Sequence, residues 1–180
     1  MTRHDVWNAK TGKATKSPSS LRPSRSLLFA VALLALTSAP AWADITGFIG
    51  ANTTPANRQV LGAAAGIGLL VVGFEVEYAF TPDDLTASAP SLKTGMGNVI
   101  LQTPAAYMGF QPYFTTGGGI YREELGAHQD TGFGLNTGGG VKVSLAGPIR
   151  LRVDYRIFKL GSSALNSPAH RIYVGLNLKI

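Results

Sequence analysis

The sequence predicts an all-β protein, in which eight antiparallel strands close into an up-and-down transmembrane β-barrel. Apolar residues alternate with polar residues or glycine along eight segments, and no segment after residue 43 has the 3.6-residue period of an amphipathic helix. The stretch 131–160 shows the pattern best, as two alternating segments that meet at Gly147 and Pro148. Successive side chains of a strand point to opposite faces, so each segment has one apolar face and one polar face.

Residues 1–43 have the organisation of a secretory signal peptide. A basic segment ends at Arg25, an apolar run spans Leu27–Leu36, and Ala41 and Ala43 flank Trp42 in a small-x-small cleavage site. The apolar run is shorter than the ~20 residues of a membrane-spanning helix. We therefore predict export through the inner membrane and cleavage after Ala43, which leaves residues 44–180 as one barrel domain. The alternative is an amphipathic or membrane-anchored N-terminus.

The basic character of the chain belongs mostly to this leader. Residues 1–43 hold six of the sixteen lysines and arginines and one of the ten acidic residues, so the rest of the chain is nearly neutral. Net charge therefore gives no indication of nucleic-acid binding. The chain has no cysteine, so the predicted domain depends on its core, on oligomerisation or on a membrane for stability.

The strands that we predict after the leader are separated by turn-rich or polar segments. Proline lies in most of these connections, and Pro112 stands at the first position of a predicted strand, where it is tolerated. Residues 81–95, 123–130 and 161–168 are predicted as polar loops. The predicted strands are residues 45–52, 60–70, 72–80, 97–102, 112–121, 131–145, 149–160 and 171–180.

The polar face decides between a membrane barrel and a soluble barrel. A lipocalin-like barrel would turn the apolar face inward and the polar face toward water. The polar face here is rich in glycine and carries few charges, of both signs, which fits a narrow lumen filled by side chains. We therefore predict that the apolar face contacts lipid.

Eight charged residues share the predicted lumen face. The third and seventh strands lie opposite each other in an eight-membered ring, so Glu75 and Glu77 are expected to face Arg150, Arg152 and Arg156. Buried charges need partners, which favours a structural network that fills the lumen; the alternative is an ion path or gate. The predicted lumen charges are Glu75, Glu77, Lys142, Arg150, Arg152, Asp154, Arg156 and Lys179.

Order and spacing of the strands resemble the small outer-membrane β-barrel family, a porin-like group that includes the membrane domain of outer membrane protein A. The resemblance implies residence in the outer-membrane bilayer, with the turns after the second, fourth and sixth strands in the periplasm. The stretches that carry it are VVGFEVEYAFTPD (71–83), GNVILQTP (97–104), QPYFTTGGGIYR (111–122), GLNTGGGVKV (134–143), RLRVDYRIFKL (150–160) and HRIYVGLNLKI (170–180).

The last strand corresponds to the family's C-terminal signal for the outer-membrane assembly machinery. Its alternating apolar residues are Val174, Leu176, Leu178 and Ile180, and the family usually has an aromatic residue in the last position. The resemblance implies a structural role in the cell envelope. Two alternatives remain open: adhesion or partner binding through the extracellular loops, for which the sequence identifies no partner, and conduction of small solutes.

The sequence does not indicate an enzyme, a metal site or a cofactor. The His-x-Ser pattern of lipid A deacylases is missing after both His128 and His170. No metal-ligand spacing appears. The glycine runs 117–119 and 138–140 continue as predicted strands, whereas a phosphate-binding loop is followed by a helix.

Overall fold

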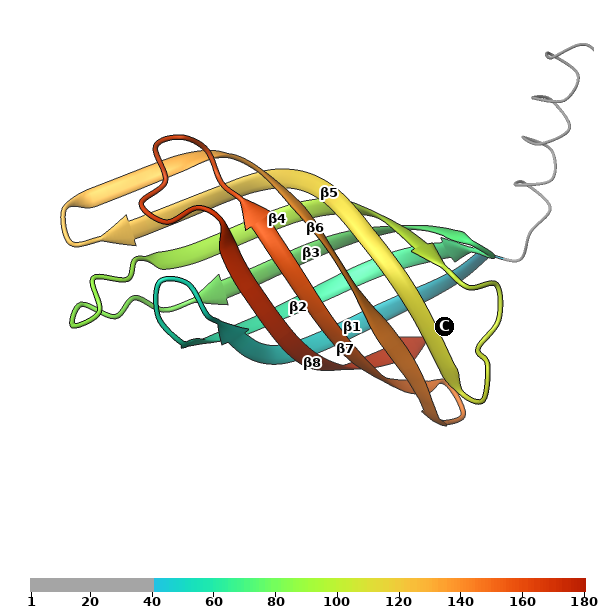
Figure 1. The fold of residues 1–180 in the computed structure, drawn as a ribbon. Helices are drawn as coiled ribbons and strands as arrows, with labels where there is room; N and C mark the ends of the chain where they lie inside the picture. The colour runs from blue at the N-terminus through green and yellow to red at the C-terminus, as the bar shows by residue number, and fades with distance from the viewer. Residues whose placement is uncertain (1–40) are drawn as a thin grey trace, which may run out of the picture. The chain divides into compact units, whose positions relative to one another are not determined.

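The computed structural model describes residues 41–180, which form a closed antiparallel barrel (Figure 1). Residues 1–40, with most of the predicted signal peptide, lie outside the described residues. Each strand pairs with the next, and β8 pairs with β1. The strands are β1 (Ala41–Asn52), β2 (Arg58–Leu69), β3 (Val72–Thr81), β4 (Ser91–Gln102), β5 (Phe110–Leu125), β6 (His128–Ala146), β7 (Ile149–Lys159) and β8 (Ala169–Lys179).

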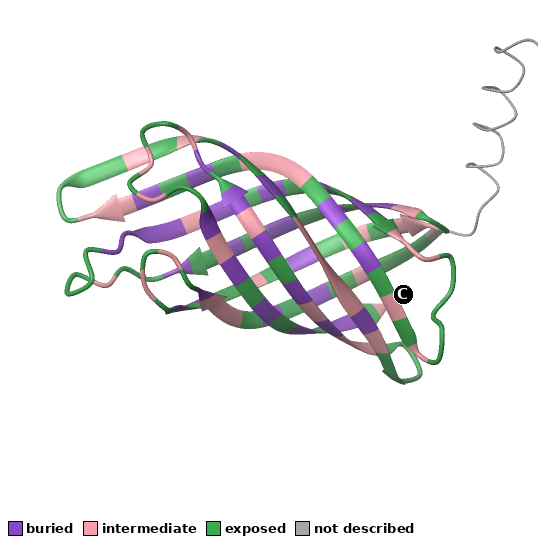
Figure 2. Cartoon of the chain, in the orientation of Figure 1, coloured by how far each residue is buried: buried purple, intermediate pink, exposed green. Residues whose placement is uncertain are grey.

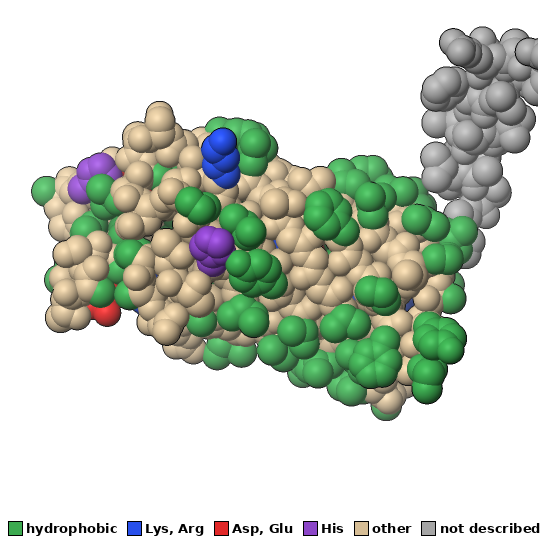
Figure 3. All heavy atoms as spheres, viewed as in Figure 1, with side chains coloured by type: hydrophobic (Ala, Val, Ile, Leu, Met, Phe, Trp, Pro, Cys, Tyr) green, Lys and Arg blue, Asp and Glu red, His purple; other side chains and the backbone are tan. Residues whose placement is uncertain are grey.

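The apolar faces of the strands point outward. Along β3, Phe74, Val76 and Tyr78 are 52 %, 69 % and 57 % exposed, whereas Glu75 and Glu77 between them are buried. The same alternation crosses neighbouring strands as buried and exposed bands (Figure 2), and hydrophobic side chains form patches over the visible exterior (Figure 3). An apolar exterior around a polar interior is the arrangement of a membrane barrel, not of a soluble lipocalin-like barrel.

The two ends of the barrel differ. Ala41 and Ile180 lie at one end, which we call the terminal end, together with the connections 70–71, 103–109 and 147–148. The opposite end, which we call the loop end, carries the connections 53–57, 82–90, 126–127 and 160–168. Residues 41–180 contain no helix that is long and apolar enough to cross a bilayer.

Two predicted loops are partly strand. The prediction of a polar loop over 123–130 is wrong, because β5 continues to Leu125 and β6 starts at His128, so that the hairpin projects beyond the loop end (Figure 1). Gly126, with a φ of 58°, allows the tight turn. Similarly, β4 starts at Ser91 and not at residue 97. In this second stretch Leu92 and Met96 point into the lumen and Lys93 and Gly95 point outward, so it lacks the apolar outer face that predicted the other strands.

Candidate functional site: a layered lumen

Side chains fill the lumen in three layers. Toward the loop end lies an apolar layer, made of Leu92, Met96, Tyr121, Phe158, Leu160 and Ala169. Next comes a layer of buried ions, the charge layer, made of Glu75, Glu77, Arg152, Asp154, Arg156 and Arg171. At the terminal end is a group that we call the terminal mouth, made of Asp44, Lys142, Arg150 and Lys179.

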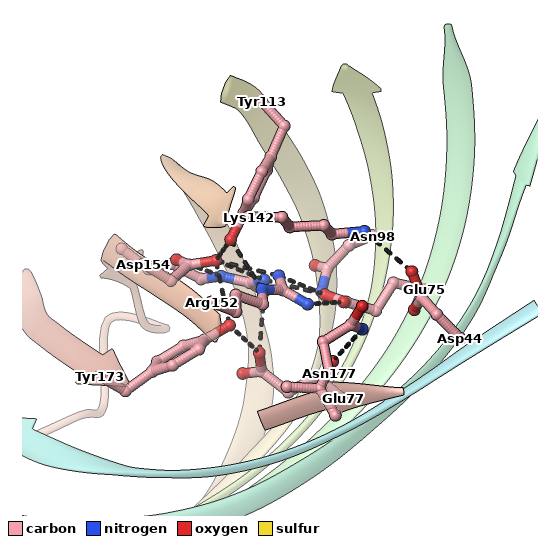
Figure 4. A network of polar contacts seen from close by, with 12 residues as sticks. Asp44, Glu75, Glu77, Asn98, Tyr113, Lys142, Arg152, Asp154, Tyr173 and Asn177 are labelled. Carbon is pink, nitrogen blue, oxygen red and sulfur yellow. Dashed lines mark hydrogen bonds and ion pairs between the residues drawn. The ribbon is translucent and has the colours of Figure 1, made fainter. Parts of the chain in front are cut away.

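The charge layer is a closed set of three guanidinium groups and three carboxylates (Figure 4). Glu75 pairs with Arg152 and with Arg156, whose Nη2 lies 2.8 Å from Oε1. Asp154 pairs with the same two arginines, at 2.9 Å from Arg152 Nη2 and 3.1 Å from Arg156 Nε. With Glu77 and Arg171, the layer has three positive and three negative side chains, so its formal charge is zero.

Glu77 joins Arg156 to Arg171 on β8. Arg171 Nη1 donates to Glu77 Oε1 at 3.1 Å, and Arg156 Nη1 lies 3.1 Å from Glu77 Oε2. The second contact is an ion pair without the alignment of a hydrogen bond, since Arg156 Nη1 has no hydrogen-bond partner among the described residues. Arg171 also stacks on Phe158, with its guanidinium carbon 4.3 Å from the ring centre, so it connects the charge layer with the apolar layer.

Two phenols attach the charge layer to the barrel wall. Tyr113, on β5, donates to Asp154 and accepts a 2.7 Å hydrogen bond from Arg152 Nε. The hydroxyl of Tyr173, on β8, lies 3.0 Å from Asp154 Oδ2 and 3.2 Å from Glu77 Oε2. Its single proton can be donated to one of these two carboxylates at a time. Phe48 stacks on Tyr173 with 4.0 Å between ring centres. These contacts link charges from β3, β7 and β8 into one polar network.

The terminal mouth has a different composition. Asp44 Oδ2 lies 2.8 Å from Lys142 Nζ and 3.2 Å from Arg150 Nη2, so one carboxylate serves two cations. Arg150 also donates to Asn177 at 2.8 Å. Lys179 lies over the Trp42 ring, 3.5 Å from its centre. These side chains surround a cavity of about 70 Å³ at the terminal end.

The structure brings five of the eight predicted lumen charges together in the charge layer: Glu75, Glu77, Arg152, Asp154 and Arg156. The expectation that Arg150 faces Glu75 or Glu77 is wrong, because Arg150 pairs across to Asn177 near the terminal end and its carboxylate partner is Asp44. Lys142 shares that partner. Lys179 makes no ion pair within residues 41–180.

Among the lumen residues that sequence reasoning missed are Asp44, Tyr113, Arg171 and Tyr173. Arg171 has the same alternation as Tyr173 and Asn177, which is a signal that could have identified it. Asp44 was predicted to follow the cleavage site directly and to lie outside the first strand. The structure instead extends β1 back to Ala41, with Asp44 paired to Gly66 and Lys179.

The predicted processing and assembly signals occupy the first and last strands. Ala41 and Ala43 are the first and third residues of β1, and cleavage after Ala43 stays a prediction. Val174, Leu176 and Leu178 point outward, with 44 %, 61 % and 45 % exposure, and Ile180 follows at 65 %. Recognition of this face by the assembly machinery also stays a prediction.

The projecting hairpin is joined to the β7–β8 connection by polar contacts. Asp130 accepts hydrogen bonds from Tyr121 at 2.7 Å and from Ser163 at 3.0 Å, and the Tyr121 hydroxyl holds the pKa of Asp130 below its usual range. The Leu165 amide donates to Glu123 at 2.9 Å. Burial raises the pKa of Glu123. Within residues 41–180, no three acidic or histidine side chains are grouped to hold a metal ion.

Comparisons with known proteins identify the fold. No family model and no curated protein sequence matches the chain. Among solved structures, it is similar to the N-terminal β-barrel domain of Pseudomonas aeruginosa OprF, with a TM-score of 0.60 and 14 % identity over 77 % of this chain and 97 % of that one. Neisserial surface protein A matches with a TM-score of 0.56 and 16 % identity over 78 % of this chain and 94 % of that one.

A third similar structure is the outer membrane protein Ail of Yersinia pestis in a phospholipid bilayer nanodisc. Its TM-score is 0.51, with 12 % identity over 78 % of this chain and all of that one. At these identities the likeness concerns the fold. The chain therefore has the eight-stranded outer-membrane β-barrel fold, and the predicted fold class is confirmed. The apolar exterior agrees with a lipid bilayer as its surroundings.

Proposed function

We propose that the protein is an integral outer-membrane barrel with a closed lumen and a structural role in the cell envelope. The observation that carries this proposal is the charge layer. Its six ionised side chains are between 0 % and 3 % exposed, and each has an oppositely charged partner. Groups that line an aqueous pore keep contact with water, whereas these groups contact one another.

Closure is also supported by the dimensions and stacking of the lumen. An eight-stranded barrel has an interior just wide enough for side chains to fill. Tyr121 and Phe158, both fully buried, lie in the apolar layer on the loop-end side of the ions. A solute path would require Arg152 to leave two carboxylates and Arg156 to leave three, and it would also require the apolar layer to open. Breaking buried pairs of this kind is costly.

We extend the proposal to a non-catalytic role. The Ser163 hydroxyl at the loop end is bonded to Asp130, and His170 shares a 2.7 Å hydrogen bond with the Tyr155 hydroxyl. Within residues 41–180, neither His128 nor His170 hydrogen-bonds a serine, which is the arrangement that would activate a hydroxyl nucleophile.

Single-channel recording in planar lipid bilayers tests the closed lumen. The protein is expected to give no unitary conductance at neutral pH, and Arg122→Ala, an exterior change at the loop end, is expected to be equally silent. The matched interior change is Arg156→Ala, which removes a fully buried guanidinium from the charge layer and is expected to produce current fluctuations. Discrete openings of the unmodified protein would support the small-solute channel instead.

A second candidate function is partner binding by the projecting hairpin. The end of β5 and the start of β6 extend beyond the loop end and are held by Asp130 and Glu123, which gives a preformed surface and not a flexible loop. Replacing residues 122–131 by a two-residue turn would remove this surface. Loss of binding of the bacterial cells to host-cell or matrix surfaces, with the barrel still folded, would favour this function over a purely structural one.

A further inference from the structure

The terminal mouth has a surplus of positive charge that the charge layer lacks. In the charge layer, three arginines face three carboxylates. In the terminal mouth, Lys142, Arg150 and Lys179 face the single carboxylate of Asp44, which leaves two uncompensated side-chain charges. A surplus of positive charge therefore lies in the part of the lumen that opens at the terminal end. Another buried cation, Arg58 at the loop end, donates to the backbone carbonyls of Thr54, Pro82 and Pro90.

These cations retain unused hydrogen-bond donors. Lys142, whose side chain is 3 % exposed, uses one ammonium donor on Asp44. An ammonium group has three donors and a guanidinium has five. Arg150, at 13 % exposure, uses one donor each on Asn177, Gln111 and Asp44. The Lys179 ammonium group has no hydrogen-bond partner within residues 41–180 and lies over the Trp42 ring.

The cavity between these groups has a suitable size. At about 70 Å³ it is larger than the roughly 10–15 Å³ that a cavity needs to hold one water, so it has room for one small ion. Lys142, Arg150 and Lys179 all line it, together with the side-chain amides of Gln102 and Gln111. A phosphate group carries about −1.5 to −2 charges at neutral pH and several strong acceptor oxygens, which matches both the surplus charge and the unused donors.

We propose that the terminal mouth binds a phosphate group, held by Lys142, Arg150 and Lys179. Asp44 positions Lys142 and Arg150 and competes with the phosphate for them. The phosphate can belong to free inorganic phosphate or to the headgroup of a phospholipid at the same membrane surface. The predicted removal of residues 1–43 would take away Trp42 and free Lys179, and it leaves the three cations in place.

Titration with inorganic phosphate tests the site. The protein is placed in nanodiscs of phosphatidylcholine at constant ionic strength, with chloride as the replaced anion, and binding is measured by isothermal titration calorimetry. Saturable binding is expected, weakened about tenfold or more by Lys179→Gln, since hydrogen bonds to charged groups are worth about 1.5–3 kcal/mol. The matched control is Lys159→Gln, on the exterior, which is expected to leave the affinity unchanged.

Asp44→Asn separates a binding site from a purely structural cluster. The change removes the competing carboxylate, so the affinity for phosphate is expected to increase. A purely structural role of Asp44 predicts no increase. Absence of saturable phosphate binding, or equal weakening by Lys179→Gln and Lys159→Gln, overturns the proposal. Lys179→Gln is expected to fold, because Lys179 makes no ion pair in the described chain.

Lipid composition distinguishes the two sources of phosphate. The titration is repeated in nanodiscs that contain phosphatidic acid, whose headgroup presents a phosphate monoester. If the native ligand is a headgroup, phosphatidic acid reduces the apparent affinity for inorganic phosphate in the unmodified protein and not in the Lys179→Gln variant. If the native ligand is free phosphate, the affinity of the unmodified protein for inorganic phosphate is the same in nanodiscs with and without phosphatidic acid.

Discussion

The two ends of the lumen are closed by different physical means. At the loop end, Tyr121 and Phe158 are packed in an apolar layer, where closure depends on burial of hydrophobic surface. At the terminal end, Lys142 and Arg150 converge on Asp44 around a small cavity. The charge layer lies between them and is neutral as a whole. The terminal end therefore keeps positive charge available for a ligand, whereas the other two layers hold the barrel shut.

The largest expected effect comes from unbalancing the charge layer. Glu75→Gln removes one carboxylate and leaves Arg152 and Arg156 short of a partner inside the barrel. Loss of one partner of a buried ion pair typically destabilises by about 3–5 kcal/mol. The free energy of unfolding, measured by denaturant titration in lipid vesicles, is expected to fall by that amount. Glu124→Gln, the same change at an exposed pair with Arg122, is expected to have little effect, and equal losses would contradict a critical charge layer.

The next effect concerns the exterior. Val76 is 69 % exposed at the middle of β3, so Val76→Arg places a charge in the hydrocarbon region and is expected to destabilise by about 2–4 kcal/mol. Val143 pairs with Phe110 near the terminal end, next to a register shift in β6. Val143→Arg is therefore expected to destabilise less, since the penalty decreases toward the interface. The same denaturant titration compares them, and a larger loss at Val143 would contradict this placement in the bilayer.

A smaller effect tests the contact between the apolar layer and the charge layer. Phe158→Leu keeps a buried hydrophobic side chain and removes the aromatic face on which Arg171 stacks at 4.3 Å. A desolvated cation–π contact is worth about 2 kcal/mol, which sets the expected loss in free energy of unfolding. Phe133→Leu, on the exterior at 65 % exposure, serves as the control with the same atoms removed. If both variants lose equally, the stacking on Arg171 does not stabilise the lumen.

The smallest effect is a pH dependence at the loop end. Burial raises the pKa of Glu123. The hydrogen bond from the Leu165 amide and the charges of His128 and Arg58 oppose this shift, and Asp130 reinforces it, so on balance the folded form binds the proton more tightly than the unfolded form. Stability at this end is therefore fully present at low pH and is lost as the pH rises through the raised pKa. Hydrogen-exchange protection of the Leu165 amide, which donates to Glu123, is expected to fall over this range. Glu123→Gln should flatten the dependence, and protection that increases with pH would contradict the assignment.

Alternation was sufficient to predict most strands and both faces of the wall. The apolar side chains of β3, for example, point outward as the sequence indicates. Because side chains alternate with a period of two, assigning the apolar face to lipid fixes the direction of every side chain in the strand. The projecting hairpin was missed for a related reason. Outside the bilayer both faces of a strand can be polar, so residues 123–130 have the composition of a loop although their backbone continues the β5–β6 ladder.

By itself, the sequence determined that Glu75, Arg150 and Arg152 share the inner face, since that follows from parity along each strand. Only the tertiary structure decided which of them meet. Asp44 and Lys142 are far apart in the chain and belong to strands that are not neighbours, yet their side chains lie 2.8 Å apart. Strands of a closed barrel are tilted and staggered, so the depth of each side chain depends on the register around the whole ring. That register places Arg150 beside Asp44 and Arg152 beside Glu75.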